Sequence, residues 1–528
     1  MRLICCCSVL LLLMLVPRFC QGGNILVFPT EGSHWINMDI LLQALHARGH
    51  NITIVRSSKS WYIKDKSSYY NAYTVQVKRS LDQQFITDLV YEVIQFERGA
   101  LPLTIFLHMT VGMFDTFLEA HRAVSDFVSA MLDDQELMRI MKDSKFDLLL
   151  TDPCWGGGPI LAKYLNLPLV YNVRWLIAGE GHLSIAPSPL SYIPITGSGN
   201  TDKMTFIQRV KNVFLHVITQ TQNELVKQIV YQKLCDKYLG PNNDFSQLLL
   251  DADIWLMRAD FVFEFPRPTM PNVVYMGGFQ CKPAKPLPEH LEEFVQTSGE
   301  HGFIMMSLGT FVSEFPADLT NYIAAAFATL PQKVIWRHKG ERPTTLGNNT
   351  LIVDWMPQND LLGHPKMKLF VAHGGTNGVQ EAIYHGVPVV GLPLFFDQYD
   401  NNLLRLQERG GAKIITLATM DQDDNFLKAI QEVLNEPSYR MSMQRLSRLH
   451  RDQPITPLEN ALFWLEFVMR HKGAAHLKAA SYKMPWYSYH SVDVVLFLAG
   501  AVLLVLFIIF VFMRCLFTTF CKRKVKHD

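Results

Sequence analysis

Residues 24–57 read NILVFPTEGSHWINMDILLQALHARGHNITIVRS: an apolar run, a polar turn, a longer amphipathic segment and a second apolar run. The runs 24–29 and 51–57 have the length and apolar content of buried strands. The segment between them has the length of a helix, which Gly49 ends. A strand, a helix and a strand in this order form a βαβ unit, because parallel strands need a long crossover connection. The stretch therefore predicts an α/β fold with a parallel sheet.

The same pattern returns further along the chain. Residues 146–152 and 167–171 are strand-like on either side of a helical segment, and residues 80–145 read as amphipathic helices rich in Phe, Leu and Met. Core packing accounts for that apolar surface, and so does the lining of a pocket for lipophilic ligands. Beyond a stretch rich in Pro and Gly, a second series of strand-like runs alternates with helices: 303–311, 333–338, 350–357, 367–375 and 387–395.

This order of elements predicts an α/β protein with two facing Rossmann-like domains. We expect the first domain at 23–276, a linker at 277–294 and the second domain at 295–475. The 528 residues, of which 49% are apolar, suffice for two full cores. Ligands of such folds bind at the carboxyl ends of the strands, so the site is expected there.

Both ends of the chain indicate a membrane protein. Residues 1–22 have one arginine, an apolar core and a small-residue end, as a cleaved secretory signal does. Residues 494–513 are long and apolar enough to span a bilayer, and the basic residues of the tail 514–528 follow them. We expect a type I protein of the endoplasmic reticulum with lumenal domains. The final KVKHD resembles a dilysine retrieval signal, although a basic stop-transfer flank reads the same way.

Charge and cysteine content exclude other classes of site. The formal net charge is +1 and the lysines and arginines form no long run before the tail, so nucleic acid is not expected as a partner. No cluster of cysteine and histidine has the spacing of a zinc site, so we expect no metal.

A second stretch, HGGTNGVQEAIYHGVPVVGLPLFFDQYDN at 373–401, predicts an anion site. A helix expected over 376–385 follows a strand directly, and Gly374 and Gly375 allow close approach of a ligand to the free N–H groups of its first turn. His373 and Asn377 would add donors to a diphosphate, whereas Glu381 suits ribose hydroxyl groups. The glycine pair alone is also what tight strand-to-helix packing requires.

Neighbouring residues strengthen the prediction. Upstream, Trp355 offers a flat face for a base and Gln358 a paired donor and acceptor; downstream, Asp397 and Gln398 are spaced to bind hydroxyl groups. The run 355–400 resembles the signature of UDP-glycosyltransferases. With its signal, anchor and tail, the whole chain resembles the vertebrate UDP-glucuronosyltransferases.

The resemblance implies a GT-B fold whose second domain holds a UDP-sugar. It implies that Trp355 stacks on uracil, that Gln358 and Glu381 hold the nucleoside, and that Asp397 and Gln398 hold the sugar. The diphosphate would be held by Ser307, His373, Gly375, Thr376 and Asn377. Two departures, Phe396 and Tyr399, bear on the choice of sugar. Arg258 matches a position proposed to meet the glucuronate carboxylate, and a structural arginine fits that position nearly as well.

The first domain is expected to activate the acceptor. His34 sits where the first strand meets the first helix, and Asp152 ends a neighbouring strand, so both should face one cleft. A histidine held by a carboxylate is a suitable general base near neutral pH. From spacing alone, helix capping or packing is the favoured explanation of both residues. The resemblance matches them to the catalytic dyad of the family, and this implies an inverting transfer.

Three functions remain open. The favoured one is transfer of glucuronic acid from UDP-glucuronate, as co-substrate, to small lipophilic phenols and alcohols. The second uses another UDP-sugar, such as UDP-glucose, UDP-galactose or UDP-xylose. The third is a non-catalytic membrane subunit, which loss of His34 or Asp152 would have favoured. We expect no permanently bound cofactor, and the resemblance implies self-association or pairing with relatives.

Overall fold

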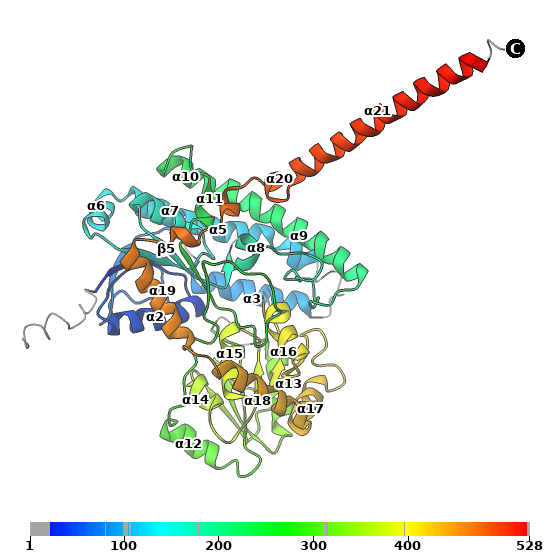
Figure 1. Cartoon of the computed structure of the whole chain (residues 1–528). Coiled ribbons are helices and arrows are strands. Elements are labelled where there is room, and N and C mark those ends of the chain that lie inside the picture. Colours follow the sequence, from blue (N-terminus) through cyan, green and yellow to red (C-terminus); the bar gives the residue numbers. More distant parts are fainter. Residues whose placement is uncertain are drawn as a thin grey trace, which may run out of the picture. The chain divides into compact units, whose positions relative to one another are not determined.

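The computed structural model describes residues 22–79, 81–98, 104, 107–176, 179–310, 312, 315–394 and 397–524 (Figure 1). Almost all of the predicted signal peptide lies outside these residues, as do Phe396 and Lys526. The chain divides into two compact units, Met1–Leu477 and Lys478–Asp528. The first unit contains two parallel sheets, which confirms the predicted pair of Rossmann-like folds.

The first sheet has seven parallel strands in the order β3-β2-β1-β4-β5-β8-β9. Its βαβ unit is the one predicted from 24–57, with Ile25 in register with Ile52. The strands are apolar on both faces because helices cover both faces of a parallel sheet. They span β1 Asn24–Phe28, β2 Asn51–Ser57, β3 Asn71–Val75, β4 Leu148–Thr151, β5 Leu169–Val173, β8 Ile254–Met257 and β9 Val273–Tyr275.

The second sheet has six parallel strands in the order β12-β11-β10-β13-β14-β15. A core of large side chains such as Phe327, Trp336 and Phe426 fills one of its faces, and a second core with Phe303 and Phe370 fills the other. The strands span β10 Phe303–Ser307, β11 Lys333–Arg337, β12 Thr350–Val353, β13 Met367–Ala372, β14 Val389–Gly391 and β15 Ala412–Ile414.

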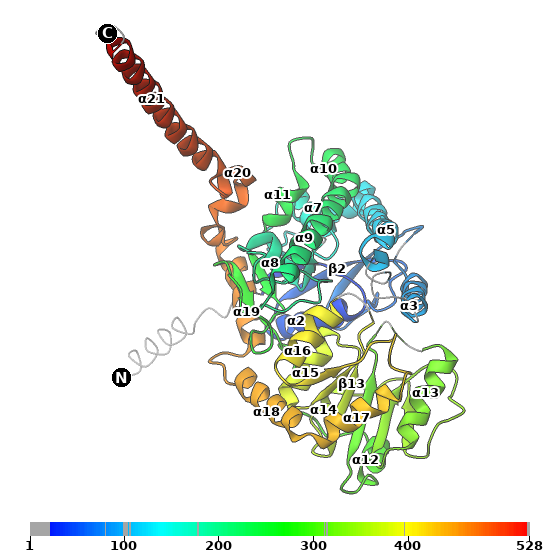
Figure 2. The ribbon, with the colours of Figure 1, turned by 90° about the vertical axis from the view of Figure 1, so that its right-hand side faces the viewer.

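The helices of the first half gather around the first sheet (Figure 2). α9 continues through a π-helical turn, η2, into α10, so the three form one long helical segment. The bounds are α2 Ser33–Ala47, α3 Gln83–Glu97, η1 His108–Gly112, α5 Phe114–Asp133, α6 Gln135–Asp143, α7 Gly157–Leu165, α8 Gly181–Ile185, α9 Phe206–Val226, η2 Lys227–Tyr231, α10 Gln232–Tyr238 and α11 Phe245–Leu250. A short hairpin, β6 Trp175–Leu176 and β7 Gly179–Glu180, follows β5.

The helices of the second half cover the second sheet, with one exception. Their bounds are α12 Glu289–Gln296, α13 Ala317–Ala328, α14 Gln358–Leu362, α15 Thr376–His385, η3 Gln398–Leu404, α16 Arg405–Glu408, α17 Asn425–Asn435, α18 Pro437–Arg451 and α19 Pro457–His471. α15 has the range predicted for the helix of the anion site, and Gly386 ends it in the left-handed conformation, with φ 69°.

The exception is α19, which packs on the first sheet beside α2 (Figure 1). Its buried residues, among them Leu462, Leu465 and Val468, belong to the same core as Ile25 and Leu41. The expected second domain, 295–475, therefore extends too far: the chain leaves the second sheet after α18. The physical reason is the apolar face of α19, which completes the core of the first sheet.

The first unit ends with the short segment η4, Ala475–Leu477. The second unit contains η5 Ala480–Lys483, α20 Trp486–Tyr489 and the long helix α21 Val492–Lys524. Within the described residues one helix is long and apolar enough to cross a membrane, over Val492–Phe520, with a mean hydropathy of 3.4. This confirms the predicted apolar helix near the C-terminus, and the helix extends beyond the expected range 494–513.

Candidate active site

His34 and Asp152 meet at the carboxyl end of the first sheet. His34 is the second residue of α2, and Asp152 directly follows β4, the neighbour of β1. His34 Nδ1 lies 2.6 Å from Asp152 Oδ2, and the backbone N–H of Cys154 donates to Asp152 Oδ1 at 3.0 Å. Burial raises the pKa of the Asp152 carboxyl group, but the charge and hydrogen bond of His34 and the nearby Arg258 outweigh it and lower the pKa. The ionised carboxylate thus orients His34 through Nδ1 and leaves Nε2 to contact a ligand.

Arg258 lies against this pair. It follows β8, and its Nη2 lies 3.4 Å from His34 Nδ1 and 3.5 Å from Asp152 Oδ2. The side chain is 5% exposed and lines the same cavity as His34. Arg258 therefore adds positive charge beside the dyad, at the border between the two halves of the site.

The predicted anion turn follows β13. Gly374 has a φ of 87°, and a side chain there would collide with Leu403. A side chain at Gly375, the N-cap of α15, would lie 2.5 Å from His373 Nε2. Burial lowers the pKa of His373 to about 4, so the ring is neutral near pH 7. The first turn of α15 and a neutral donor thus surround a space that suits phosphate oxygens.

The predicted nucleoside residues lie next to this turn. Trp355 is 65% exposed, with the guanidinium of Arg337 over its ring at 5.7 Å from the centroid. Gln358 Nε2 donates to Glu381 Oε2 at 2.7 Å, which joins the first residue of α14 to α15. Burial raises the pKa of Glu381 to about 7, with the Gln358 hydrogen bond opposing the shift. A flat exposed ring and a paired amide and carboxyl group are what a nucleoside requires.

The predicted sugar residues are tied into the second half. Asp397 Oδ2 accepts from Thr376 Oγ1 at 3.1 Å and from Asn402 Nδ2 at 3.1 Å. Gln398 Oε1 accepts from the backbone N–H of Leu394 at 2.8 Å. Ser307, at the end of β10, is 3% exposed, and its hydroxyl group accepts from the backbone N–H of Gly309 at 3.4 Å.

One cavity of about 920 Å³ joins the two halves. Every residue predicted for the site lines it except Asp152, which lies behind His34. Asn37 Nδ2 of α2 donates to Asn377 Oδ1 of α15 at 2.8 Å, so the halves also touch directly at the anion turn. The general base candidate and the anion turn therefore face the same space.

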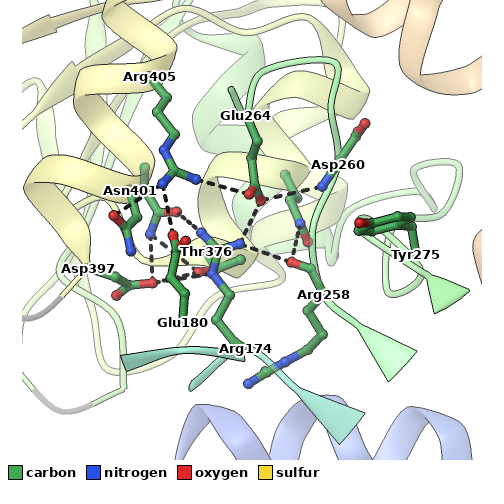
Figure 3. A network of polar contacts seen from close by, with 12 residues as sticks. Arg174, Glu180, Arg258, Asp260, Glu264, Tyr275, Thr376, Asp397, Asn401 and Arg405 are labelled. Atoms are coloured by element: carbon green, nitrogen blue, oxygen red, sulfur yellow. Dashed lines mark hydrogen bonds and ion pairs between the residues drawn. The ribbon is translucent and has the colours of Figure 1, made fainter. Parts of the chain in front are cut away.

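Beneath this cavity a buried network of charges joins the halves (Figure 3). Arg174 Nη1 donates to Glu264 Oε1 at 2.6 Å, and Arg405 Nη1 donates to Glu264 Oε2 at 3.0 Å. Arg405 Nη2 donates to Glu180 Oε1 at 2.8 Å, and Arg267 also pairs with Glu180. Burial raises the pKa of Glu180, but the three arginines Arg405, Arg267 and Arg174 outweigh it and hold the pKa well below its usual range.

Arg174 connects this network to Asp397, one of the two residues predicted to hold the sugar. Its Nη2 donates to Asn402 Oδ1 at 2.9 Å, and its Nε lies 3.6 Å from Asp397 Oδ2. Sequence reasoning missed Arg174, although the signal was present: Arg174 directly follows β5, as Asp152 follows β4 and Arg258 follows β8. Arg405 and Glu264 had no such signal, because they lie on a helix and a loop and meet only in the folded chain.

The comparisons with known proteins agree with this geometry. Residues 23–527 match the family described as UDP-glucoronosyl and UDP-glucosyl transferase. The chain is 42% identical over 506 residues to UDP-glucuronosyltransferase 2A2 of Homo sapiens, which covers 94% of this chain and 92% of the relative. It is 43% identical over 495 residues to UDP-glucuronosyltransferase 2A1 of Mus musculus, with 92% of each chain covered.

Solved structures show the same fold. The calicheamicin glycosyltransferase CalG4 superposes with a TM-score of 0.55 at 16% identity, covering 85% of this chain and 99% of its own. The glycosyltransferase VinC, in complex with DTDP, superposes with a TM-score of 0.54 at 18% identity, covering 85% of this chain and 100% of its own. The two parallel sheets with a shared cavity are thus a GT-B fold. The chain is an enzyme that belongs to the UDP-glucuronosyltransferase family.

Proposed function

We propose that the chain transfers glucuronic acid from UDP-glucuronate to hydroxyl groups of small lipophilic acceptors and forms β-glucuronides. One observation carries the proposal: His34, held by Asp152 at 2.6 Å, lines the same cavity as the anion turn at His373. The cavity brings together a base for an acceptor and a cradle for a diphosphate leaving group. The single hydrophobic helix near the C-terminus supports membrane anchorage, and we place the site in the lumen of the endoplasmic reticulum.

The mechanism follows from these positions. His34 Nε2 takes the proton of the acceptor hydroxyl group. At the same time the hydroxyl oxygen attacks the anomeric carbon of the sugar from the face opposite UDP. The bond from that carbon to the UDP oxygen breaks, and UDP leaves with the electron pair. Asp152 stabilises the imidazolium ion that forms. The N–H groups at the start of α15 and the neutral His373 stabilise the charge on UDP. Attack from the opposite face turns an α-linked donor into a β-glycoside.

The donor is tested through Arg258. If its guanidinium meets the glucuronate carboxylate, Arg258→Met should lower kcat/KM for UDP-glucuronate about tenfold more than kcat/KM for UDP-glucose, because a charge-assisted hydrogen bond is lost with one donor only. Any damage to the neighbouring dyad affects both donors equally and cancels in this ratio. Arg258→Lys, which keeps the charge, serves as control. An unchanged ratio in Arg258→Met, or wild-type turnover with UDP-glucose, UDP-galactose or UDP-xylose alone, would overturn the donor assignment.

Trp355→Ala should raise KM for the donor about tenfold or more and leave kcat nearly unchanged. The reason is that stacking of a base on an aromatic ring contributes about 1–3 kcal/mol and stabilises ground state and transition state alike. Initial rates at varied UDP-sugar concentration measure both constants. Trp355→Phe should retain most of the affinity. A Trp355→Ala enzyme with wild-type KM would show that the base binds elsewhere.

UDP should bind more tightly as pH rises from 6 to 8. The pKa of Glu381 is raised to about 7, so the carboxyl group is largely protonated at pH 6 and ionised at pH 8. Ribose hydroxyl groups donate to the ionised form, and affinity should therefore increase by up to about tenfold across this range. Calorimetric titration of wild type and Glu381→Gln separates this effect from the ionisation of UDP itself. A pH dependence of equal size in the variant would contradict the assignment.

A further inference from the structure

Two helices of the first half, α5 and α9, wall the cavity beside the dyad, and they pack against each other (Figure 2). Most of their lining side chains are apolar, as an acceptor pocket for lipophilic molecules requires: Phe114, Phe117, Val124 and Phe127 of α5, and Leu215 and Val226 of α9. The polar lining side chains are Thr116 and His121 of α5 and Thr219, Gln222 and Asn223 of α9, and of these only His121 and Asn223 are buried. Each is only 7% exposed.

His121 offers a hydrogen-bond donor. Burial lowers its pKa to about 3, so the ring is neutral and carries one proton. Its Nδ1 lies 2.8 Å from the hydroxyl oxygen of Tyr231, a residue with no exposed surface. Burial raises the pKa of Tyr231, which keeps its proton, and that proton needs an acceptor. Tyr231 therefore donates to Nδ1, and the ring proton sits on Nε2 of a side chain that lines the cavity.

Asn223 offers the second hydrogen-bond donor. Its Nδ2 is buried, and none of the described residues accepts a hydrogen bond from it. Asn223 lies two helical turns before Tyr231 in the continuous segment of α9 and η2. The same segment therefore carries Asn223 and the tyrosine that is hydrogen-bonded to His121. A buried amide N–H without a partner is costly, and nearly all buried polar groups in proteins have one. In this cavity the partner can come from a bound molecule.

We propose that His121 and Asn223 form a second subsite in the acceptor pocket, where they donate hydrogen bonds to an oxygen atom of the acceptor molecule. The inference rests on the proposed function, since it refines the class of acceptor. The substrate would be a lipophilic molecule with two oxygen functions: the hydroxyl group that faces His34, and a remote carbonyl, ether or hydroxyl oxygen. Both groups of the subsite are neutral, which favours a neutral oxygen over a carboxylate.

The test compares two phenols that differ only in this oxygen: a 4-alkylphenol, and the same phenol with a ketone near the far end of the alkyl chain. The methylene groups insulate the ring, so the reacting hydroxyl group is equally acidic in both. The ratio of kcat/KM for ketone over alkane should exceed one in the wild type. It should fall about 5- to 10-fold in Asn223→Leu, whose side chain has a similar size, and in His121→Phe.

Thr221→Val serves as control, because Thr221 is exposed on α9 and its hydroxyl group already donates to the carbonyl of Val217 at 2.8 Å. Its ratio should equal that of the wild type. Equal ratios in the wild type, Asn223→Leu and His121→Phe would overturn the subsite and show that water satisfies both groups. If no acceptor is turned over at all, the proposed function fails, and equilibrium dialysis of the same two phenols decides the subsite. Tighter binding of the ketone by wild type alone supports it, and equal binding refutes it.

Discussion

His34→Ala should lower kcat for phenol acceptors by about 10²–10⁴-fold and leave the affinity for UDP unchanged. This range is what a positioned general base contributes to proton removal during attack. The variant removes the ring whose Nδ1 is held by Asp152 at 2.6 Å, while the residues of the anion turn lie on other elements. Initial rates with saturating donor measure kcat, and calorimetry measures UDP binding.

A set of phenols of graded acidity distinguishes loss of a base from loss of structure. A phenol that is already ionised at the assay pH needs no base, so its kcat should fall much less in His34→Ala than that of an ordinary phenol with a pKa of about 10. Asp152→Asn keeps the shape of the side chain but removes the charge that stabilises the imidazolium ion, and it should show the same pattern. An equal loss for all phenols would contradict the assignment of His34 as base.

Glu264→Gln should lower the free energy of unfolding by about 3–5 kcal/mol, because it leaves two buried arginines without their shared carboxylate. Arg174 and Arg405 both bond to Glu264, at 2.6 and 3.0 Å, and all three side chains are at most 6% exposed. Thermal unfolding of the purified full chain in detergent, followed by tryptophan fluorescence, should show Tm lower by several degrees. KM for the donor should also rise, since Arg174 contacts Asp397 and Asn402.

Glu136→Gln is the matched control. Its partner is Arg139 at 2.7 Å on the surface of α6, and the Glu136 side chain is 65% exposed, so solvent screens the pair. Tm of this variant should stay close to that of the wild type. Two variants with the same Tm would mean that the buried network does not hold the two halves together.

Most of the architecture could be predicted because hydrophobic periodicity and the residues that end helices and strands are local features of the sequence. The run 24–57 contained a whole βαβ unit, and the helix expected over 376–385 has the bounds of α15. Strands such as β3 and β15 were missed because they are short and carry polar residues, so tertiary pairing rather than pattern makes them strands. The return of α19 to the first sheet was beyond local signals, since an amphipathic helix does not specify which sheet it covers.

The candidate site also contains some residues that could be placed from the sequence and some contacts that could not. Residues that follow strands, such as His373 and Asp152, could be placed because the ends of parallel strands meet at one edge of a sheet. The pairing of Gln358 with Glu381, and of Asn37 with Asn377, depends on how the elements pack, and neither contact is visible in sequence spacing. Arg405 lies 141 residues from Glu264, so its role emerged only from the fold.

The most direct test of the account is the product formed by the full chain in microsomes from UDP-glucuronate and a phenol, with its anomeric configuration determined by proton NMR. The account predicts a β-glucuronide from the wild type and little product from His34→Ala. An α-glucuronide would contradict single displacement by an acceptor that His34 activates. A product formed at the wild-type rate by His34→Ala would show that the His34–Asp152 pair is not the base.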